Sequence, residues 1–397
     1  MHLKSLQIKN FRALEDLKIS KLGQVNLIVG KNNSGKSSVL EALRIYAGAA
    51  HPVLLEEIAT THDERYKLTE SEWLTEPDEL PFENFFTGRK FPNTDNNPIL
   101  IGEDDTQTEN TKNLIIEHNY MISYEETIEE NGESIIKKKR DFVSKSKITS
   151  EDLDYDTQTL CVVKNHQLKI INLDSTIAHK FNRTWFEAAD ILPCSNVPTQ
   201  FISMDELAKI WDEVQFSSHG DFVKEGLKTI SPDFENIAFV NNESETIFSR
   251  TGTRKLQGNS QRTAKVKLKG VDKAISLNSM GDGMLRVLQL LLKIYPARNG
   301  FLLIDEFENG LHYSVQEKIW AYIFDFSKKL DIQVFATTHS WDCIESFSKI
   351  ALDKTDIDGV LFRVGKSVRT SDNGKIIATV FNEEQLFNIT QSDVEVR

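Results

Sequence analysis

Residues 30–37 restrict the possible folds of this chain more than any other segment. They read GKNNSGKS and match the phosphate-binding pattern G-x-x-x-x-G-K-[ST]. The apolar run QVNLIVG leads into them and predicts a buried strand, and residues 39–50 then have a helical pattern. Strand, glycine-rich turn and helix together form a phosphate cradle, because successive backbone N–H groups and the helix N-terminus face the anion. The segment predicts a nucleoside triphosphate site in an α/β fold.

Four residues of this turn have distinct expected roles. Gly30 and Gly35 permit the backbone torsions that turn the amides inward. Lys36 adds a positive charge beside the terminal phosphates, and the Ser37 hydroxyl is a candidate ligand of Mg²⁺. A glycine turn followed by a surface lysine is the alternative interpretation. The flanking strand and helix favour the nucleotide site.

A second strand end supplies two carboxylates. The run FLLI at 301–304 is followed at once by Asp305 and Glu306. In a parallel sheet this is the edge where ligands bind. Asp305 is expected to hold Mg²⁺ directly or through water, and Glu306 to polarise a water near the γ-phosphate. Two acids at a strand end can also cap a turn, but the phosphate-binding turn elsewhere in the chain favours the metal interpretation.

Two further motifs belong to the same chemistry. LNSMGDGMLRVL places Ser279, Gly281 and Gly283 in a short loop before a helix, which is a second anion cradle. One nucleotide does not need two cradles in one subunit, so two subunits facing head to tail would each offer this loop to the partner's nucleotide. QVFATTHS ends a strand with His339, where an imidazole can reach the γ-phosphate. A glycine-rich helix start and a polar strand end are the simpler interpretations of each motif alone.

The chain is expected to consist of a discontinuous head and an inserted lobe. Strands and helices alternate in the head, which covers 1–50 and 191–397, and this indicates an α/β core with a largely parallel sheet. Residues 51–190 are acidic and interrupted by prolines, and they contain a predicted hairpin that turns at Asn131 and Gly132. A second strand pair is predicted over 159–173. We expect this β-rich insertion to bind a partner or sense a trigger.

Composition excludes several other classes of protein. The net charge of −13 argues against bulk adhesion to nucleic acid or to an anionic membrane. Three widely spaced cysteines indicate neither a zinc site nor a disulfide framework. The N-terminus lacks the apolar core of a signal peptide, and no run reaches the ~20 apolar residues that span a bilayer. We expect a soluble cytoplasmic protein.

Taken in order, these motifs resemble a known family. The phosphate-binding turn, the S-x-G-D-G loop, LLIDEFENGLH and ATTHS are similar to an ATP-binding-cassette (ABC) head of the SMC/RecF type. They resemble more specifically the ATPase domain of the OLD (overcoming-lysogenisation-defect) nucleases and their stand-alone relatives. The resemblance covers about 1–46 and 191–363. It implies an ABC-type P-loop head with a mostly parallel sheet and an antiparallel β-lobe, which binds ATP and Mg²⁺ as a homodimer or higher homo-oligomer.

The resemblance also implies a role for individual residues. Glu306 would be the general base, His339 the switch histidine, and Gln200 the Q-loop residue that bridges Mg²⁺ and the attacking water. Asn309 would lie in the loop that crosses the dimer interface. The phosphates would be bound by Gly30, Lys31, Asn32, Asn33, Ser34, Gly35, Lys36, Ser37 and Ser38, and in trans by Ser279, Gly281 and Asp282. The loop reads NSMGDG instead of Ser-Gly-Gly-Gln, which argues against a transporter.

The family's nuclease function is not expected here. OLD nucleases continue into a Toprim domain with a D-x-D pair, and the segment after Arg363 is too short for one. Asp356 and Asp358 match D-x-D, but a solvated turn explains them better. We therefore expect an ATPase that regulates a separate effector, plausibly a Toprim-type nuclease in defence against phage. The alternatives are a RecF/SMC-like DNA-binding ATPase, for which the basic stretches 137–140 and 250–269 are candidate contacts, and a nucleotide-bound scaffold with negligible turnover.

Overall fold

The computed structural model describes most of the chain. The described residues are 2–64, 81–92, 97–104, 112–130, 133–143, 157–173, 190–241, 247–249, 252–254, 262–381, 385–386 and 388. The predicted turn at Asn131 and Gly132 lies outside them. Among the described residues, no helix has the length and apolar character that crossing a membrane requires.

The centre of the molecule is a six-stranded sheet in the order β18-β17-β3-β16-β15-β9. Five of these strands run parallel, and only the edge strand β18 is antiparallel. The strands are β3 (Val25–Val29), β9 (Cys194–Val197), β15 (Phe301–Ile304), β16 (Gln333–Thr338), β17 (Gly359–Lys366) and β18 (Ile376–Phe381). The predicted α/β fold with a mostly parallel sheet is confirmed.

Side-chain alternation along these strands builds one hydrophobic core on each face of the sheet. On β15, Leu302 and Ile304 belong to one core, whereas Phe301 and Leu303 belong to the other. The first core contains residues of α4 (Met204–Val214), α5 (Ser218–Ile230), α6 (Asp282–Ile294), α7 (Tyr313–Lys329) and α8 (Trp341–Asp353). The second contains residues of α1 (Lys36–Ala47), α2 (Pro52–Thr61), β1 (Leu6–Phe11) and β2 (Leu14–Ile19).

The second sheet joins the N-terminus to the region predicted as an insertion. It has seven strands in the order β2-β1-β4-β5-β7-β8, with β6 paired to β5, and all of its adjacent strands are antiparallel. Its remaining strands are β4 (Ile99–Gly102), β5 (Asn113–Glu130), β6 (Glu133–Val143), β7 (Thr157–Lys164) and β8 (Gln167–Asn172). The predicted hairpin and the second strand pair are therefore present. The division of the chain at residues 50 and 190 stays a prediction.

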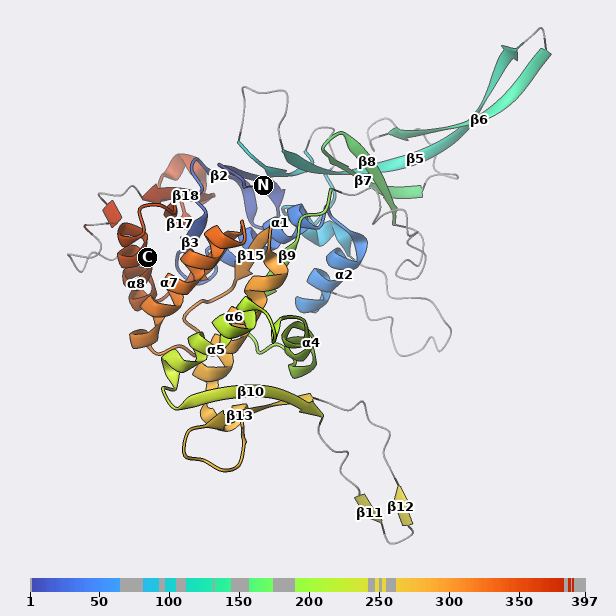
Figure 1. Cartoon of the computed structure of the whole chain (residues 1–397). Coiled ribbons are helices and arrows are strands. Elements are labelled where there is room, and N and C mark those ends of the chain that lie inside the picture. Colours follow the sequence, from blue (N-terminus) through green and yellow to red (C-terminus); the bar gives the residue numbers. More distant parts are fainter. Residues whose placement is uncertain are drawn as a thin grey trace.

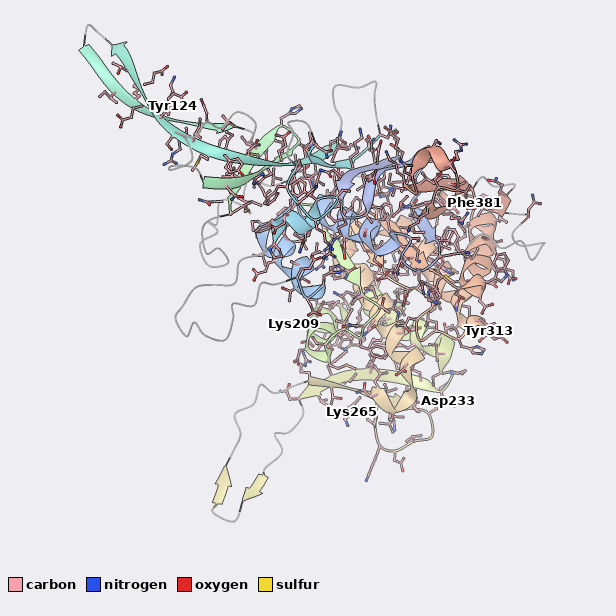
Figure 2. The ribbon with its side chains drawn as sticks, turned by 180° about the vertical axis from the view of Figure 1, so that it is seen from behind. Tyr124, Lys209, Asp233, Lys265, Tyr313 and Phe381 are labelled. Atoms are coloured by element: carbon pink, nitrogen blue, oxygen red, sulfur yellow. The ribbon has the colours of Figure 1, made fainter. Side chains whose placement is uncertain are left out.

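The outer parts of the molecule project in two directions. The β5–β6 hairpin extends away from the body at one end, where Figure 2 labels Tyr124. A smaller sheet of β10 (Phe234–Asn241), β13 (Arg262–Leu268) and β14 (Ile275–Ser276) lies at the opposite end, below α4 and α5 in Figure 1. The remaining short elements are β11 (Ile247–Ser249), β12 (Gly252–Arg254) and the 3-10 helices η1 (Phe82–Phe85), η3 (Leu277–Met280), η4 (Tyr295–Ala297) and η5 (Thr370–Asp372).

Candidate active site

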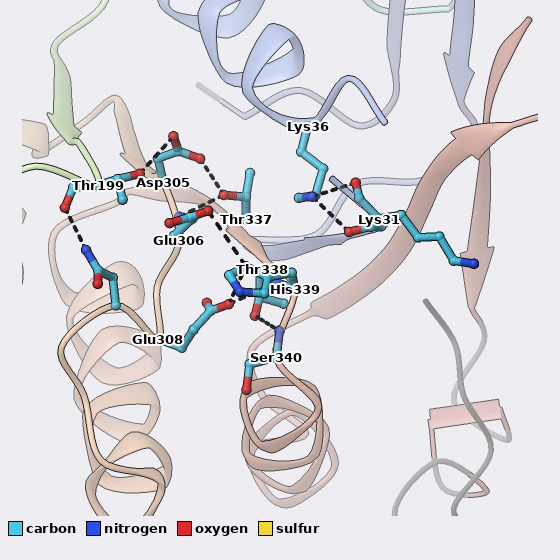
Figure 3. A network of polar contacts seen from close by, with 12 residues as sticks. Lys31, Lys36, Thr199, Asp305, Glu306, Glu308, Thr337, Thr338, His339 and Ser340 are labelled. Atoms are coloured by element: carbon cyan, nitrogen blue, oxygen red, sulfur yellow. Dashed lines mark hydrogen bonds and ion pairs between the residues drawn. The ribbon is translucent and has the colours of Figure 1, made fainter. Parts of the chain in front are cut away.

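Parallel pairing brings three strand ends to one edge of the central sheet. β16 lies between β3 and β15, and its residues pair with Val29 on one side and Ile304 on the other. The loop after β3, the acids after β15 and the polar residues that end β16 are therefore neighbours in space, as Figure 3 shows. Strand pairing alone thus assembles most of the candidate site.

The turn between β3 and α1 requires its glycines. A Cβ on Gly30 would lie 2.3 Å from the carbonyl oxygen of Val364, and Gly35 has a φ of +96°. Gly35 precedes α1, and no side chain caps this helix, so the first-turn N–H groups remain available to an anion. The Ser34 hydroxyl is buried and has no hydrogen-bond partner in the described part of the chain. These features fit a phosphate cradle.

Lys36 lies folded over the same turn. Its Nζ donates hydrogen bonds to the carbonyl oxygens of Gly30, at 2.8 Å, and Lys31, at 3.0 Å. The residue is only 9% exposed, and this burial lowers the pKa of Lys36, whereas nearby carboxylates, Asp305 first among them, raise it. A phosphate group would give this buried ammonium group a stronger hydrogen-bond partner than the two neutral carbonyl oxygens.

Asp305 is held by two threonine hydroxyls. Thr337 Oγ1 donates to one carboxylate oxygen at 2.6 Å, and Thr199 Oγ1 donates to the other at 3.2 Å. Asp305 also lines a cavity of about 360 Å³ together with Ser37, Thr199 and Gln200. Oxygen ligands of this kind suit Mg²⁺, which keeps several of its waters. The residues predicted to hold the metal therefore share one cavity.

Glu306 and His339 lie side by side at the same edge. Glu306 has a left-handed φ of +46°, and its N–H donates to Thr337 Oγ1 at 2.9 Å. Its carboxylate is 3.7 Å from His339 Nδ1 and is partly exposed. A left-handed non-glycine residue is a strained feature of a kind that gathers at functional sites. The strand ends thus present a carboxylate and an imidazole towards the turn that holds Lys36.

The predicted signature loop lies elsewhere on the surface. Ser279 is exposed in η3 and donates to the Ser276 carbonyl at 2.6 Å, and Gly281 has a φ of +93°. Asp282 then begins α6 without a side-chain cap on the helix. These residues do not line the cavity that contains Ser37. Within one chain the loop is therefore not part of the site, and the role in trans stays a prediction.

The predicted interface residue Asn309 is tied to its own chain. Its Nδ2 donates to the Thr199 carbonyl at 2.7 Å, and its backbone N–H donates to the backbone carbonyl oxygen of Glu306 at 3.0 Å. The loop that carries it also approaches α6, since a Cβ on Gly310 would lie 3.6 Å from the Asp282 carbonyl oxygen. The loop after the acids and the signature helix therefore pack against each other.

Sequence patterns missed three residues that organise the site. Arg286, which is 1% exposed, donates to the carbonyl oxygens of Pro198, Asp305 and Glu306 at 2.7, 2.8 and 2.9 Å. Burial lowers the pKa of Arg286 to about 10, so the side chain is charged at neutral pH. Thr337 and Thr199 hold Asp305, as described above. Two signals in the sequence could have pointed to them. They are the arginine within the apolar run MLRVLQLLL and the adjacent residues Thr337 and Thr338 at the end of a strand.

Comparison with known sequences identifies the family. The family described as "AAA ATPase domain" matches residues 1–344. The chain belongs to this AAA ATPase domain family. Membership implies ATP binding, in agreement with the phosphate-binding turn. The resemblance to SMC/RecF-type and OLD ATPase heads is confirmed.

The chain is similar to several individual proteins. It is 26% identical to the ATP/GTP phosphatase of Helicobacter pylori over 367 residues, which cover 89% of each chain. It is 46% identical to the OLD nuclease of Thermus scotoductus over 52 residues, only 13% of this chain and 10% of that protein. A solved Smc head domain from Pyrococcus furiosus is 13% identical, covers 98% of both chains and has a TM-score of 0.47.

Replacement of Thr337 by valine tests the link between the two acids. Valine keeps the shape but removes the donor to Asp305 and the acceptor of the Glu306 N–H. We expect kcat for nucleotide hydrolysis to fall about 10- to 100-fold, which is the usual cost of losing a hydrogen bond that holds a metal-binding carboxylate. The Mg²⁺ concentration needed for the half-maximal rate should rise. Thr338→Val is the control, since that hydroxyl accepts from Ser340 instead. An unchanged Mg²⁺ titration for Thr337→Val would contradict this assignment.

Proposed function

We propose that this protein is a Mg²⁺-dependent ATP hydrolase whose active site is completed by a second copy of the chain. One observation carries the proposal. The acids Asp305 and Glu306 follow β15, His339 follows β16, and both strands run parallel to the strand that leads into the phosphate cradle. A nucleotide bound with its phosphates at Lys36 would therefore meet a metal-holding carboxylate, a base and an imidazole at the same edge.

The side chains divide the chemistry among them. The first-turn amides of α1 and the Lys36 ammonium bind the terminal phosphates and draw charge towards the leaving group. Ser37, Asp305 and Gln200 would hold Mg²⁺, which supplies charge neutralisation of the β- and γ-phosphates when bound. Glu306 accepts a proton from the attacking water, and the γ-phosphoryl group is transferred to that water to give ADP and phosphate. His339 contacts the γ-phosphate beside this base.

The nucleotide class includes GTP as a second candidate substrate. The Helicobacter pylori relative, similar over 89% of this chain, is named an ATP/GTP phosphatase. The residues proposed to bind the phosphates would not contact the adenine or guanine ring, so they would not discriminate ATP from GTP. Each assay described below is therefore run with both nucleotides.

Substitution of Glu306 and Lys36 separates turnover from binding. Glu306→Gln keeps nucleotide binding but cannot accept the proton, so we expect kcat to fall by ~10²–10⁴-fold. Lys36→Ala removes the phosphate-neutralising charge and is expected to abolish binding of a fluorescent nucleotide. Phosphate release and equilibrium binding measure the two effects. Wild-type turnover by Glu306→Gln would show that Glu306 is not the base, and a wild-type protein without turnover would favour the scaffold alternative.

A composite site follows from the position of the signature loop. Ser279 and Gly281 form an exposed, uncapped helix start that is separate from the cavity of their own chain. Oxygen atoms of a γ-phosphate bound by another copy would complete this helix start, because no side chain of the described residues caps its N–H groups.

Mixing two inactive variants tests the composite site. Ser279→Arg blocks the loop that serves the partner, and Lys36→Ala blocks the chain's own phosphate site. A mixed dimer contains one intact site, so an equimolar mixture that exchanges subunits should regain about a quarter of wild-type activity. Each variant alone should remain inactive, although Ser279→Arg still binds nucleotide. Rates that stay at the sum of the two separate variants, despite proven subunit exchange, would exclude the composite site.

The effector is proposed to be a separate protein, a nuclease of the Toprim type that acts against phage. The local similarity to the Thermus scotoductus OLD nuclease supports this link. The D-x-D pair of this chain is a poor metal site, because Asp356 is paired with Lys328 at 2.6 Å and Asp358 with Lys21 at 3.2 Å. Both precede β17 and so lie at the sheet edge opposite to Asp305. Among the described residues, no group of three or more acids, histidines or cysteines is arranged to hold a metal ion.

Direct DNA binding is the weaker alternative. The described part of the basic stretch on β6 faces an acidic strand, with Lys139 paired to Glu126. In the second stretch, Arg262 pairs with Asp212 and also bonds the Phe239 carbonyl oxygen. These partners neutralise cations that a phosphate backbone would need.

A cleavage assay distinguishes the head from a nuclease. We expect purified protein to leave plasmid and linear DNA intact in the presence of ATP with Mg²⁺ or Mn²⁺. DNA affinity that falls steeply with salt would favour the DNA-binding alternative. Cleavage that survives purification and disappears in the Asp356→Ala/Asp358→Ala variant would show that the chain itself is the nuclease. The matched control is Asp353→Ala, an exposed acid at the end of the preceding helix.

A further inference from the structure

Glu308 makes the closest contacts to His339 of any acid at the site. Its Oε1 accepts the backbone N–H of His339 at 2.9 Å and lies 3.1 Å from Nδ1 of the same residue. Glu306, in contrast, is 3.7 Å from this ring nitrogen. Figure 3 shows both carboxylates beside His339, each joined to it by a dashed line. One carboxylate oxygen thus binds both the main chain and the side chain of His339.

The protein fixes Glu308 in this position. Its side chain is only 11% exposed, and its Oε2 is buried without a hydrogen-bond partner among the described residues. The preceding Phe307 anchors the loop, because its ring is fully buried and stacks on Trp320 with centroids 3.9 Å apart. The N–H of Phe307 donates to the backbone carbonyl oxygen of Thr337, and the N–H of Leu311 donates to the backbone carbonyl oxygen of Glu308. Both ends of the segment are therefore restrained.

A buried carboxylate with one unpaired oxygen is costly, so its retention calls for a reason. Hydrophobic packing does not provide this reason, because an apolar side chain would pack at this position better than the Glu308 carboxylate. Among the described residues, the hydrogen-bond and ion-pair contacts of the carboxylate are to the backbone N–H and to Nδ1 of His339, and its charge also acts on Arg286 and Lys36. A carboxylate beside Nδ1 favours the form of the ring with a proton on that nitrogen. It therefore leaves Nε2 as the nitrogen available to a ligand.

We propose that Glu308 is a positioning residue that fixes the orientation of the His339 imidazole and prevents a closer ion pair between His339 and Glu306. This inference rests on the proposed ATP hydrolysis. By occupying Nδ1, Glu308 leaves the Glu306 carboxylate free to accept the proton of the attacking water. The ring already lies 3.7 Å from Glu306, and without Glu308 it would be free to move closer and form a tighter ion pair with the base. Glu308 acts through His339 and does not itself contact the nucleotide.

The proposal predicts a loss of turnover without a loss of binding. Glu308→Ala should lower kcat about 10- to 100-fold, as removal of a carboxylate behind a functional histidine usually does, with KM for ATP changed less than about threefold. Glu308→Gln keeps an oxygen that accepts from both N–H groups and should recover most of that loss. Glu317→Gln, on the exposed face of α7, is the matched control and should behave as wild type.

A double-mutant cycle decides whether Glu308 works through the histidine. In a His339→Ala background, Glu308→Ala should change kcat less than about twofold, since the group that it positions is gone. If Glu308→Ala does not fold, as judged by thermal melting and nucleotide binding, Glu308→Asp replaces it, because the shorter side chain withdraws the carboxylate from Nδ1.

The outcomes separate this inference from the proposed function. An equal loss from the Glu308 substitution in both backgrounds, or full activity of Glu308→Ala beside an inactive Glu306→Gln, overturns the positioning role and leaves the ATPase proposal intact. A wild-type protein that hydrolyses neither ATP nor GTP overturns the ATPase proposal itself.

Discussion

The parallel pairing of β3, β16 and β15 is the constraint on which the rest of the site depends. Backbone hydrogen bonds fix the register so that Val29, Thr338 and Ile304 end at one edge. The phosphate cradle, the histidine and the acids come from distant parts of the sequence, yet each follows directly from one of these strands. Apolar side chains on both faces bury the sheet and hold that register, because a one-residue slip would exchange the two cores. The site is thus a consequence of sheet packing.

Buried charge at this edge is balanced by neighbouring polar groups. Arg286 places a guanidinium on three carbonyl oxygens around the acids, and Lys36 is held over the carbonyls of its own loop. The Asp305 carboxylate accepts hydrogen bonds from the hydroxyls of Thr199 and Thr337 instead of pairing with a cationic side chain. The acids therefore remain available to a metal ion and a water, whereas the backbone that carries them is rigid. Arg286 also joins α6 to the backbone of Asp305 and Glu306, so the proposed signature helix and the proposed catalytic acids are directly connected.

The N-terminal strands link the ATPase head to the region predicted to bind a partner. β1 pairs with β2 on one side and with β4 on the other, so strands from 99–172 extend the sheet that the N-terminus begins. Arg12, in the turn between β1 and β2, contacts Glu41 on α1 at 2.9 Å and Glu64 at 3.3 Å. Arg12 therefore connects the sheet that contains β4–β8 to α1, the helix that follows the phosphate-binding turn.

The sequence by itself determined the family and the class of fold. The octapeptide at 30–37, the apolar run before Asp305 and the strand ending at His339 each carry a local pattern, because glycine torsions and side-chain periodicity act over a few residues. Only the tertiary structure decided that Thr337 and Thr199 hold Asp305, that Arg286 caps the backbone of the acids, and that Glu308 binds the histidine. These contacts join residues 19 to 106 positions apart, and no local pattern encodes them. Whereas torsional preference and periodicity are properties of neighbouring residues, a partner across the sheet is selected by strand register and burial, which exist only after the chain has folded.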